Sequence, residues 1–224
     1  MERFVYESKE YKTFLEEHPH EHGEKKFLES IAEKGMTAVD VGGNSGMAAC
    51  AISRAVGETG KVYCFEPIPE FREVLEENLN HNTLKNVEVV PAAVGKEPGT
   101  THFHVDGTGT SIVPHGEGHE KMTASVVCLD EFFAERDLPG LDLLNMDCEG
   151  SELFVLQGAR RLLSANRTKV FVETHHDLLK TLGQSARMIV DFLHELGYTV
   201  SSVTLADLNM GEDWESCEYL FAQR

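Results

Sequence analysis

Positive charge and cysteine are both scarce in this sequence, and each scarcity excludes a class of function. Twenty Lys and Arg stand against 38 Asp and Glu, so the formal net charge of -18 repels nucleic-acid phosphates and anionic membrane surfaces. The five cysteines are odd in number and lack C-x-x-C spacing, which indicates neither a disulfide framework nor a zinc knuckle. We therefore expect no nucleic-acid partner, no membrane partner, and a reducing cytoplasm as the location.

Long apolar runs are also missing. Residues 1–18 are charged throughout, without the apolar core of a secretory signal, and no later run has the roughly 20 apolar residues that cross a bilayer. The length of 224 residues and the hydrophobic share of 41% suit one globular core. We expect a helical segment over residues 1–35, acting as a lid or a lead-in, followed by one domain over residues 36–224. The sequence gives no indication of the oligomeric state.

Strands and helices are predicted to alternate after residue 35, which is typical of α/β proteins with a parallel sheet. Gly and Thr are frequent in residues 106–122, which predicts a long loop that serves either as a lid or as a plain excursion. Helices are expected over 47–56, around 71–79, over 151–163 and around 188–196. Strands are expected at 37–41, 61–65, 87–94, 101–105, 125–129, 141–147 and 169–173, with a terminal hairpin of 198–203 and 218–222.

The turn after the first predicted strand carries the clearest functional signal. Gly42, Gly43 and Gly46 allow the backbone to approach a ligand at the N-terminus of the next helix, which suits a nucleotide-like cofactor. The dinucleotide fingerprint G-x-G-x-x-G fails in either register, and no Gly-Lys-Ser/Thr of a P-loop follows. Glu66 ends the second predicted strand, where a carboxylate can accept hydrogen bonds from both hydroxyls of a ribose.

Candidate residues for chemistry end the fourth and fifth long strands. Asp147 is expected to position substrate or cofactor and is a candidate base, and His175 could accept a hydroxyl proton near neutral pH. Asp147, Glu173 and His175 could instead converge on a divalent metal, although strand-end histidines are often plain polar caps. Glu149 and Glu152 are better explained by capping of the next helix than by catalysis. We assign no residue as a metal ligand.

Four stretches together resemble the FkbM family of methyltransferases over roughly residues 36–200. In that family the first motif commonly reads Asp-Val-Gly-Ala-Asn-x-Gly, the second ends Phe-Glu-Pro, and Lys-x-Asp-x-Glu-Gly closes the fourth strand. This sequence departs at Gly43, where alanine is usual and glycine is expected to be harmless, and at Asn145, where lysine is more frequent. The matching stretches are residues 39–46, 65–67, 127–132 and 147–152.

The resemblance implies a Rossmann-like class I methyltransferase fold. Its sheet would have seven mostly parallel strands, an antiparallel terminal strand and helices on both faces, and residues 36–224 would form the methyltransferase domain. The implied cofactor is S-adenosylmethionine, with S-adenosylhomocysteine as product. The implied cofactor-binding residues are Asp40, Gly42, Gly43, Asn44, Gly46, Glu66, Pro67, Ala92, Ala93 and Asp147.

The resemblance further implies methyl transfer to a hydroxyl oxygen of a small metabolite or sugar. Asp147 and His175 are the candidate catalytic residues. The Asp/Asn-Pro-Pro-Tyr/Phe motif of amino-group methyltransferases is missing, and Asp147-Cys148-Glu149-Gly150 stands in its place. Two alternatives remain open at this point: methylation of RNA or protein, and a cofactor-binding subunit without catalysis.

Overall fold

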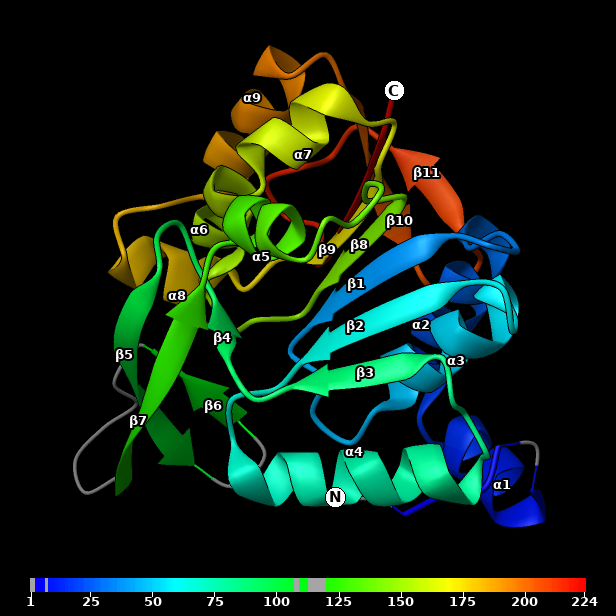
Figure 1. Cartoon of the computed structure of the whole chain (residues 1–224). Helices are drawn as coiled ribbons and strands as arrows, with labels where there is room; N and C mark the ends of the chain where they lie inside the picture. Colours follow the sequence, from blue (N-terminus) through cyan, green and yellow to red (C-terminus); the bar gives the residue numbers. More distant parts are fainter. Residues whose placement is uncertain (1–2, 7, 107–108, 113–119) are drawn as a thin grey trace.

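An eight-stranded sheet forms the centre of the computed structural model, which describes residues 3–6, 8–106, 109–112 and 120–224 (Figure 1). The strand order is β11-β10-β12-β9-β8-β1-β2-β3. Neighbours from β3 to β9 pair in parallel, whereas β12 runs antiparallel between β9 and β10. The strands are β1 (Thr37–Val41), β2 (Lys61–Phe65), β3 (Val87–Val90), β8 (Leu143–Met146), β9 (Lys169–Glu173), β10 (Thr199–Thr204), β11 (Asn209–Gly211) and β12 (Tyr219–Gln223).

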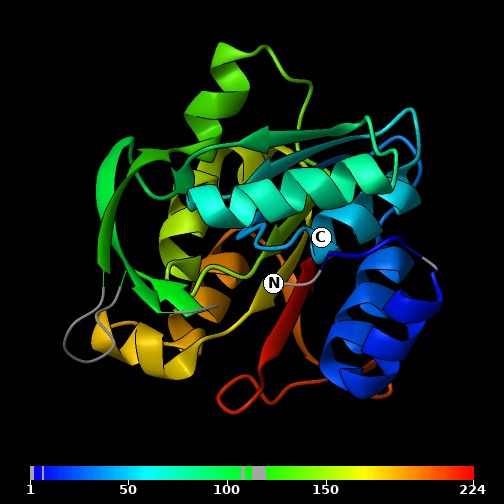
Figure 2. The same cartoon turned by 90° about the horizontal axis from the view of Figure 1, so that it is seen from below.

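The predicted architecture is confirmed, with the short edge strand β11 as an addition to the seven expected strands. Helices cover both faces of the sheet, and Figure 2 shows α1 and α2 (blue) on the side opposite to α5 (green). The helices are α1 (Lys9–Glu17), α2 (Pro19–Ile31), α3 (Met47–Val56), α4 (Pro69–His81), α5 (Leu129–Glu135), α6 (Glu152–Gly158), α7 (Arg160–Ala165), α8 (His176–Thr181) and α9 (Ala186–Glu195).

The alternation of side chains along β2 explains why both faces need helices. Val62 packs in the cluster that α2 and α3 cover, while Tyr63 and Phe65 face the opposite cluster. Both aromatic rings make edge contacts with Phe132 of α5. Because side chains alternate with a period of two, a strand that is buried on both faces must be apolar almost throughout. The same reasoning applies to β1, where Ala38 and Val39 point to opposite faces.

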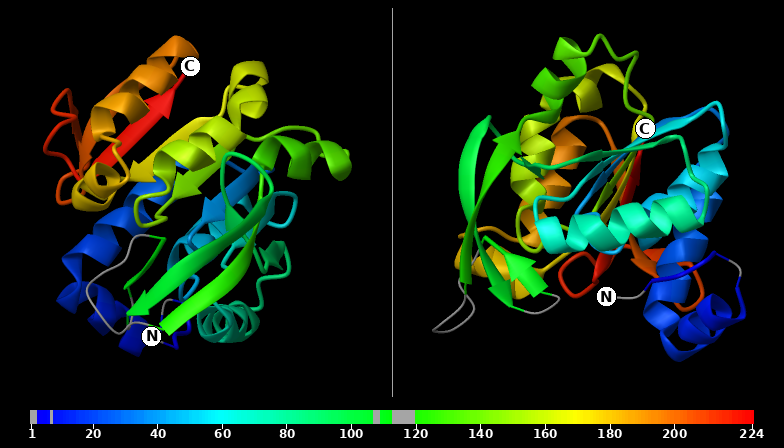
Figure 3. Two further views of the ribbon diagram at one scale, coloured as in Figure 1. Left: turned by 90° about the vertical axis from the view of Figure 1, so that its left-hand side faces the viewer. Right: turned by 60° about the horizontal axis from the view of Figure 1, so that its bottom comes forward.

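A second sheet, in the order β4-β7-β5-β6, lies at the carboxyl end of the large sheet (Figure 3, left). The single strand expected over 87–94 is wrong, because Pro91 has no backbone N–H for a ladder and divides β3 from β4. The strand expected at 125–129 instead ends at Val127, and Cys128 is the N-cap of α5. These strands are β4 (Ala93–Val94), β5 (Gly99–Asp106), β6 (Gly109–Ser111) and β7 (Glu120–Val127).

Two other expected segments also differ from the structure. The helix expected over 151–163 is broken into α6 and α7, and the backbone of Gly158 is so close to β4 that a Cβ there would lie 2.1 Å from the oxygen of Gly95. The expected loop 106–122 contains β6 and the start of β7. The rest of that loop, residues 107–108 and 113–119, lies outside the described residues, and so does any role as a lid.

The N-terminal segment forms two helices that meet at His18. Ser8 caps α1 by accepting a hydrogen bond from the backbone of Tyr11, and α2 packs on the large sheet through Phe27 and Leu28. Among the residues that the structure describes, no helix has the length and apolarity needed to cross a membrane. Helix α1 packs through Tyr11 and Leu15 on residues of α3 and α4.

Candidate active site

The glycine turn is held between the ends of two strands. Gly42 and Gly43 both donate backbone hydrogen bonds to the oxygen of Phe65, at 3.0 and 3.1 Å. Gly42 has a φ of +93°, and a Cβ at this position would lie 1.7 Å from the backbone oxygen of Asp147. Residue 42 must therefore be glycine for two reasons: its backbone has a positive φ, and the backbone of Asp147 leaves no room for a side chain. Gly46, with a φ of +86°, is the N-cap of α3.

Gly43 differs from the alanine that is usual in the resembling family, and its neighbours fill the space of the missing methyl group. A Cβ at Gly43 would lie 2.5 Å from the sulfur of Cys64 and 2.6 Å from Cδ1 of Leu75. Its φ lies outside the left-handed region that favours glycine, so the constraint is steric. The side chains of Cys64 and Leu75 thus occupy the space that the methyl group of an alanine would need.

We expect Gly43→Ala to lower the free energy of unfolding by about 1–3 kcal/mol, the usual cost of an overpacked core. Cys64→Ala removes the nearest atom, so the double variant should recover part of that loss. Urea unfolding of the two single variants and the double variant measures the coupling. Strictly additive losses would contradict the proposed collision between residues 43 and 64.

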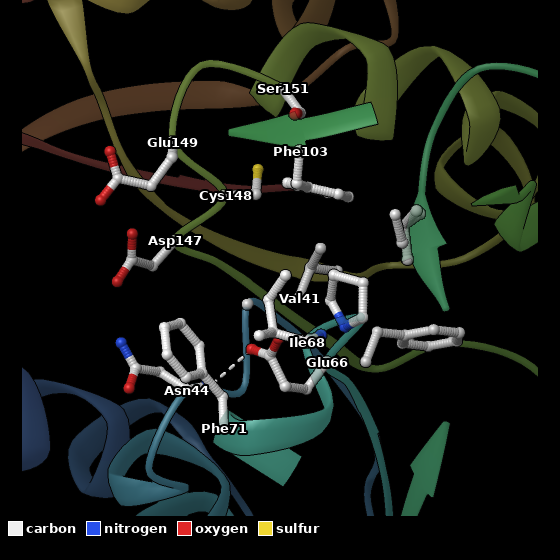
Figure 4. Close-up of a pocket in the computed structure, with 15 residues that line it drawn as sticks. Val41, Asn44, Glu66, Ile68, Phe71, Phe103, Asp147, Cys148, Glu149 and Ser151 are labelled. Atoms are coloured by element: carbon white, nitrogen blue, oxygen red, sulfur yellow. Dashed lines mark hydrogen bonds between the residues drawn. The ribbon is translucent and has the colours of Figure 1, made fainter. Parts of the chain in front are cut away.

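Glu66 is a buried carboxylate that holds two turns at once. It is 3% exposed, its Oε2 accepts a hydrogen bond from the backbone of Asn44 at 2.8 Å, and its Oε1 accepts one from Ile68 at 2.7 Å (Figure 4). Burial raises the pKa of Glu66 to about 7, against the lowering by these two N–H groups and by Arg72, while Asp40 adds to the rise. Each carboxylate oxygen keeps acceptor capacity for a further donor.

Glu66 lines the first pocket, which borders the glycine turn. Six residues expected from the sequence line it, namely Gly42, Asn44, Glu66, Pro67, Ala93 and Asp147. Its apolar wall includes Ile68, Phe71 and Phe103, which the sequence-based site did not include (Figure 4). The mixture of apolar walls with few polar groups is typical of small-molecule sites.

Different elements supply this apolar wall. Ile68 and Phe71 belong to the start of α4, whereas Phe103 comes from β5 and packs with them in one cluster. The helical spacing of Phe71 is a signal for core packing only, and the pairing of β5 with β7 cannot be seen in the local sequence. Phe103 could therefore be recognised as a site residue only once the second sheet was known.

The second pocket lies between the N-terminal helices, the glycine turn and the ends of β8 and β9. It shares Gly42, Asn44, Asp147 and Glu149 with the first pocket. Gly43 also lines it, and so do His18 and His20 of the N-terminal segment. Its acidic lining residues are Glu21, Glu24, Asp147, Glu149 and Glu173, and its described lining contains no Lys or Arg.

This concentration of carboxylates makes the second pocket strongly negative. Burial and the charges of Asp147 and Glu21 raise the pKa of Glu24. Burial and the charge of Glu173 raise the pKa of Asp147, while His175 opposes the rise. A pocket of this kind suits a ligand with positive charge.

His175 is surrounded by carboxylates. Its Nδ1 lies 2.7 Å from Oε1 of Glu152, and its Nε2 lies 3.5 Å from Asp147, 3.7 Å from Glu149 and 4.0 Å from Glu173. Burial acts to lower the pKa of His175, but the hydrogen bond to Glu152 and the nearby charges raise it to about 9. In the absence of a bound cation the imidazole is therefore protonated at neutral pH and cannot accept a proton.

Three expected cofactor residues line neither pocket. Asp40 is fully buried beneath the glycine turn, where it accepts hydrogen bonds from the amide of Asn145 at 2.8 Å and from the thiol of Cys64 at 3.4 Å. Burial raises the pKa of Asp40. Gly46 starts α3, and Ala92 is a core residue beside Ala93. Asp40, Gly46 and Ala92 therefore stabilise the glycine turn and the end of β3 without lining either pocket.

Comparison with known proteins gives one family and one fold. A family model described as the methyltransferase FkbM domain matches residues 40–200. The crystal structure of methyltransferase FkbM from Methylobacillus flagellatus KT aligns with a TM-score of 0.55 at 16% identity, covering 88% of this chain and 50% of that chain. A putative O-methyltransferase from Klebsiella pneumoniae aligns with a TM-score of 0.53 at 15% identity, covering 91% and 80%. These likenesses show the class I methyltransferase fold.

A curated relative matches over a shorter stretch. The protein-L-isoaspartate O-methyltransferase of Methanococcoides burtonii is 40% identical over 57 residues, which cover 25% of this chain and 28% of that protein. This chain thus spans little more than a quarter of the curated relative and half of the FkbM structure.

Proposed function

Because this chain belongs to the FkbM family of methyltransferases, we propose that it transfers a methyl group from S-adenosylmethionine to a hydroxyl oxygen of a small molecule. The observation that carries the proposal is Glu66, a buried carboxylate with spare acceptor capacity at the edge of an apolar pocket. That combination fits a nucleoside, whose ribose presents two hydroxyl donors beside a flat apolar base.

The residues of the first pocket fit this cofactor by their chemistry. Glu66 would accept hydrogen bonds from the ribose, and Phe71, Ala93 and Phe103 would contact the adenine. Bound S-adenosylmethionine would supply an electrophilic methyl group on a sulfonium centre. The shared residue Asp147 leads into the acidic second pocket, which suits the cationic end of that molecule.

The acceptor would bind in the second pocket. Asp147 lines both pockets, so its carboxylate can accept a hydrogen bond from an acceptor hydroxyl and orient the oxygen toward the first pocket. Alignment and exclusion of water can supply much of the rate of such a transfer. We assign His175 to positioning the acceptor as well, because it lines the second pocket and its Nε2 lies 3.5 Å from Asp147.

The N-terminal segment, residues 1–35, is proposed to close the acceptor side, with residues 36–224 as the methyltransferase domain. Phe14, His18 and Glu24 of this segment line the second pocket, which supports this division. The free cysteines and the acidic charge support a cytoplasmic enzyme for a small molecule rather than for nucleic acid.

A protein acceptor is the second candidate, because the curated relative is named for protein L-isoaspartate. A carboxylate acceptor would enter a pocket lined by Glu21, Glu24 and Glu173, which would repel it. The charge of the second pocket therefore favours a neutral hydroxyl over a carboxylate.

Calorimetric titration with S-adenosylhomocysteine, beside NAD, tests the cofactor. Incubation with methyl-labelled S-adenosylmethionine and a panel of hydroxylated metabolites, with an isoaspartyl peptide and RNA in parallel, then tests the acceptor. Binding of S-adenosylhomocysteine and label in a hydroxylated compound are expected. Preference for NAD would reject the cofactor assignment, and label only in the peptide or RNA would reject the acceptor class. Cofactor binding without transfer to any acceptor would favour a non-catalytic subunit.

The affinity for S-adenosylhomocysteine should fall as the pH falls through 7. The pKa of Glu66 is raised to about 7, and only its ionised form accepts hydrogen bonds with both oxygens. Asn44, Ile68 and Arg72 favour the ionised form, while Asp40 opposes it. Binding at pH 6 should therefore be about tenfold weaker than at pH 8. Calorimetry at pH 6, 7 and 8 measures how the affinity depends on pH. Glu66→Gln should remove this dependence. If the variant keeps the same pH dependence, a group other than Glu66 causes it.

A further inference from the structure

Three side chains at the junction of the two pockets present ligand atoms to one another. One oxygen each from Asp147 and Glu149 and one nitrogen of His175 all lie within 4.8 Å of each other. Figure 4 shows the carboxylates of Asp147 and Glu149 on the same side of the β8 end. Glu173 adds a fourth potential donor, 4.0 Å from the same nitrogen.

The distances within this group are wrong for direct hydrogen bonds. Nε2 of His175 lies 3.5 Å from Asp147 and 3.7 Å from Glu149, beyond the normal range for an N–H donor. Ligands held at about 2.1 Å from one ion are separated by roughly 3.0–3.4 Å, as the bond lengths around such ions require. The two distances from His175 exceed the spacing of ligands around one small ion by only a few tenths of an ångström.

The orientation of His175 is fixed from the opposite side of the ring. Its Nδ1 is bound by Glu152, a fully buried carboxylate that also accepts a hydrogen bond from the backbone of Gly150 at 3.1 Å. The other oxygen of Glu152 has no hydrogen-bond partner within the described part of the chain. A carboxylate behind one imidazole nitrogen, with the second nitrogen directed at other donors, is the usual support of a metal-binding histidine.

The backbone adds a second constraint on the same group. Glu149 has a φ of +49° and Gly150 a φ of +97°, so the turn after Asp147 is in the left-handed region at two successive residues. A left-handed conformation is uncommon at a non-glycine residue and is held in place by the surrounding structure. The turn at Glu149 and Gly150 brings a carboxylate oxygen of Glu149 within 4.8 Å of one of Asp147.

We propose that Asp147, Glu149 and His175 bind one divalent transition-metal ion, such as Mn²⁺ or Zn²⁺, with Glu173 as a further ligand. The imidazole favours such an ion over Ca²⁺, which takes oxygen ligands. The site goes beyond the proposed methyl transfer. Because Asp147 and Glu149 line both pockets, the ion would lie where an acceptor hydroxyl meets the methyl donor.

Electron paramagnetic resonance with Mn²⁺ tests the site in the full chain without any cofactor. After treatment with EDTA and removal of the chelator, one Mn²⁺ per chain should bind and reduce the signal of the free ion. Glu149→Gln and Asp147→Asn should each weaken binding at least about tenfold. Glu76→Gln removes the same charge from an exposed residue of α4 that lines neither pocket, and it should leave binding unchanged.

A competition experiment identifies the imidazole as a ligand. Zn²⁺ should displace Mn²⁺, whereas equimolar Ca²⁺ should not, and His175→Gln should remove this difference. Equal competition by Ca²⁺, or Mn²⁺ binding that survives both carboxylate substitutions, would overturn the proposal. Titration with S-adenosylhomocysteine is independent of these results: cofactor binding without Mn²⁺ binding refutes the metal site alone, and the reverse result refutes the proposed function alone.

Discussion

Glu66→Ala is expected to weaken binding of S-adenosylhomocysteine by about 10–150-fold, because hydrogen bonds to a charged group contribute about 1.5–3 kcal/mol. Glu66 is the buried carboxylate of the first pocket, and the substitution removes both of its oxygens. The loss also frees the backbone N–H groups of Asn44 and Ile68, so the walls of the pocket become less well defined. Isothermal titration calorimetry of the purified variant measures the effect.

Two companion variants separate the loss of ligand contacts from a general loss of structure. Glu76→Ala, on the exposed side of α4, should bind as tightly as the unmodified chain. Glu66→Gln keeps the size of the side chain and one carbonyl acceptor, so its affinity should fall between the two. Circular dichroism should report the same helix content for all three. Undiminished binding by Glu66→Ala would mean that the first pocket does not hold the ribose.

Gly42→Ala is expected to be the most damaging single methyl addition at the site. The added Cβ would lie 1.7 Å from the backbone oxygen of Asp147, and the φ of +93° would strain any side chain. Strain costs about 1–3 kcal/mol and overpacking another 1–3 kcal/mol, so the free energy of unfolding should fall by about 2–6 kcal/mol. Because Asp147 must move, binding of S-adenosylhomocysteine should also be lost. Urea unfolding and calorimetry measure the two effects.

Gly35→Ala is the matched control for this substitution. Gly35 has a φ of +86°, but the nearest atom to its Cβ is 3.7 Å away, which is ordinary contact. It should therefore show only the cost of strain, about 1–2 kcal/mol, with cofactor binding intact. If Gly42→Ala and Gly35→Ala lowered the free energy of unfolding equally, the close contact between the glycine turn and the end of β8 would contribute nothing to the cost.

The parts of the site that could be predicted from the sequence are those set by local spacing. Glu66 follows directly from an apolar strand, and the glycine turn lies between a strand and a helix, so both could be placed at one edge of a parallel sheet. Asp147 and His175 were found in the same way, because each follows a buried strand. The ends of parallel strands meet at one edge whatever the details of packing.

The parts that could not be predicted depend on contacts between distant segments. Phe103 reaches the first pocket only because β5 pairs with β7, and β7 with β4. His20 lies in the N-terminal segment, far in sequence from the strand ends, and the packing of α2 against the sheet brings it to the second pocket, 3.9 Å from Glu173. The first-turn position of Glu152 predicted a cap, and its burial behind His175 could be known only from the fold.

The four residues common to the two pockets, Gly42, Asn44, Asp147 and Glu149, form a wall that both sites share. If a ligand in one pocket reorders this shared wall, the affinity of the other pocket changes, and linkage requires the same factor in both directions. The rearrangement of these shared residues would then determine whether the methyl donor or the acceptor binds first. Product inhibition patterns would report this order.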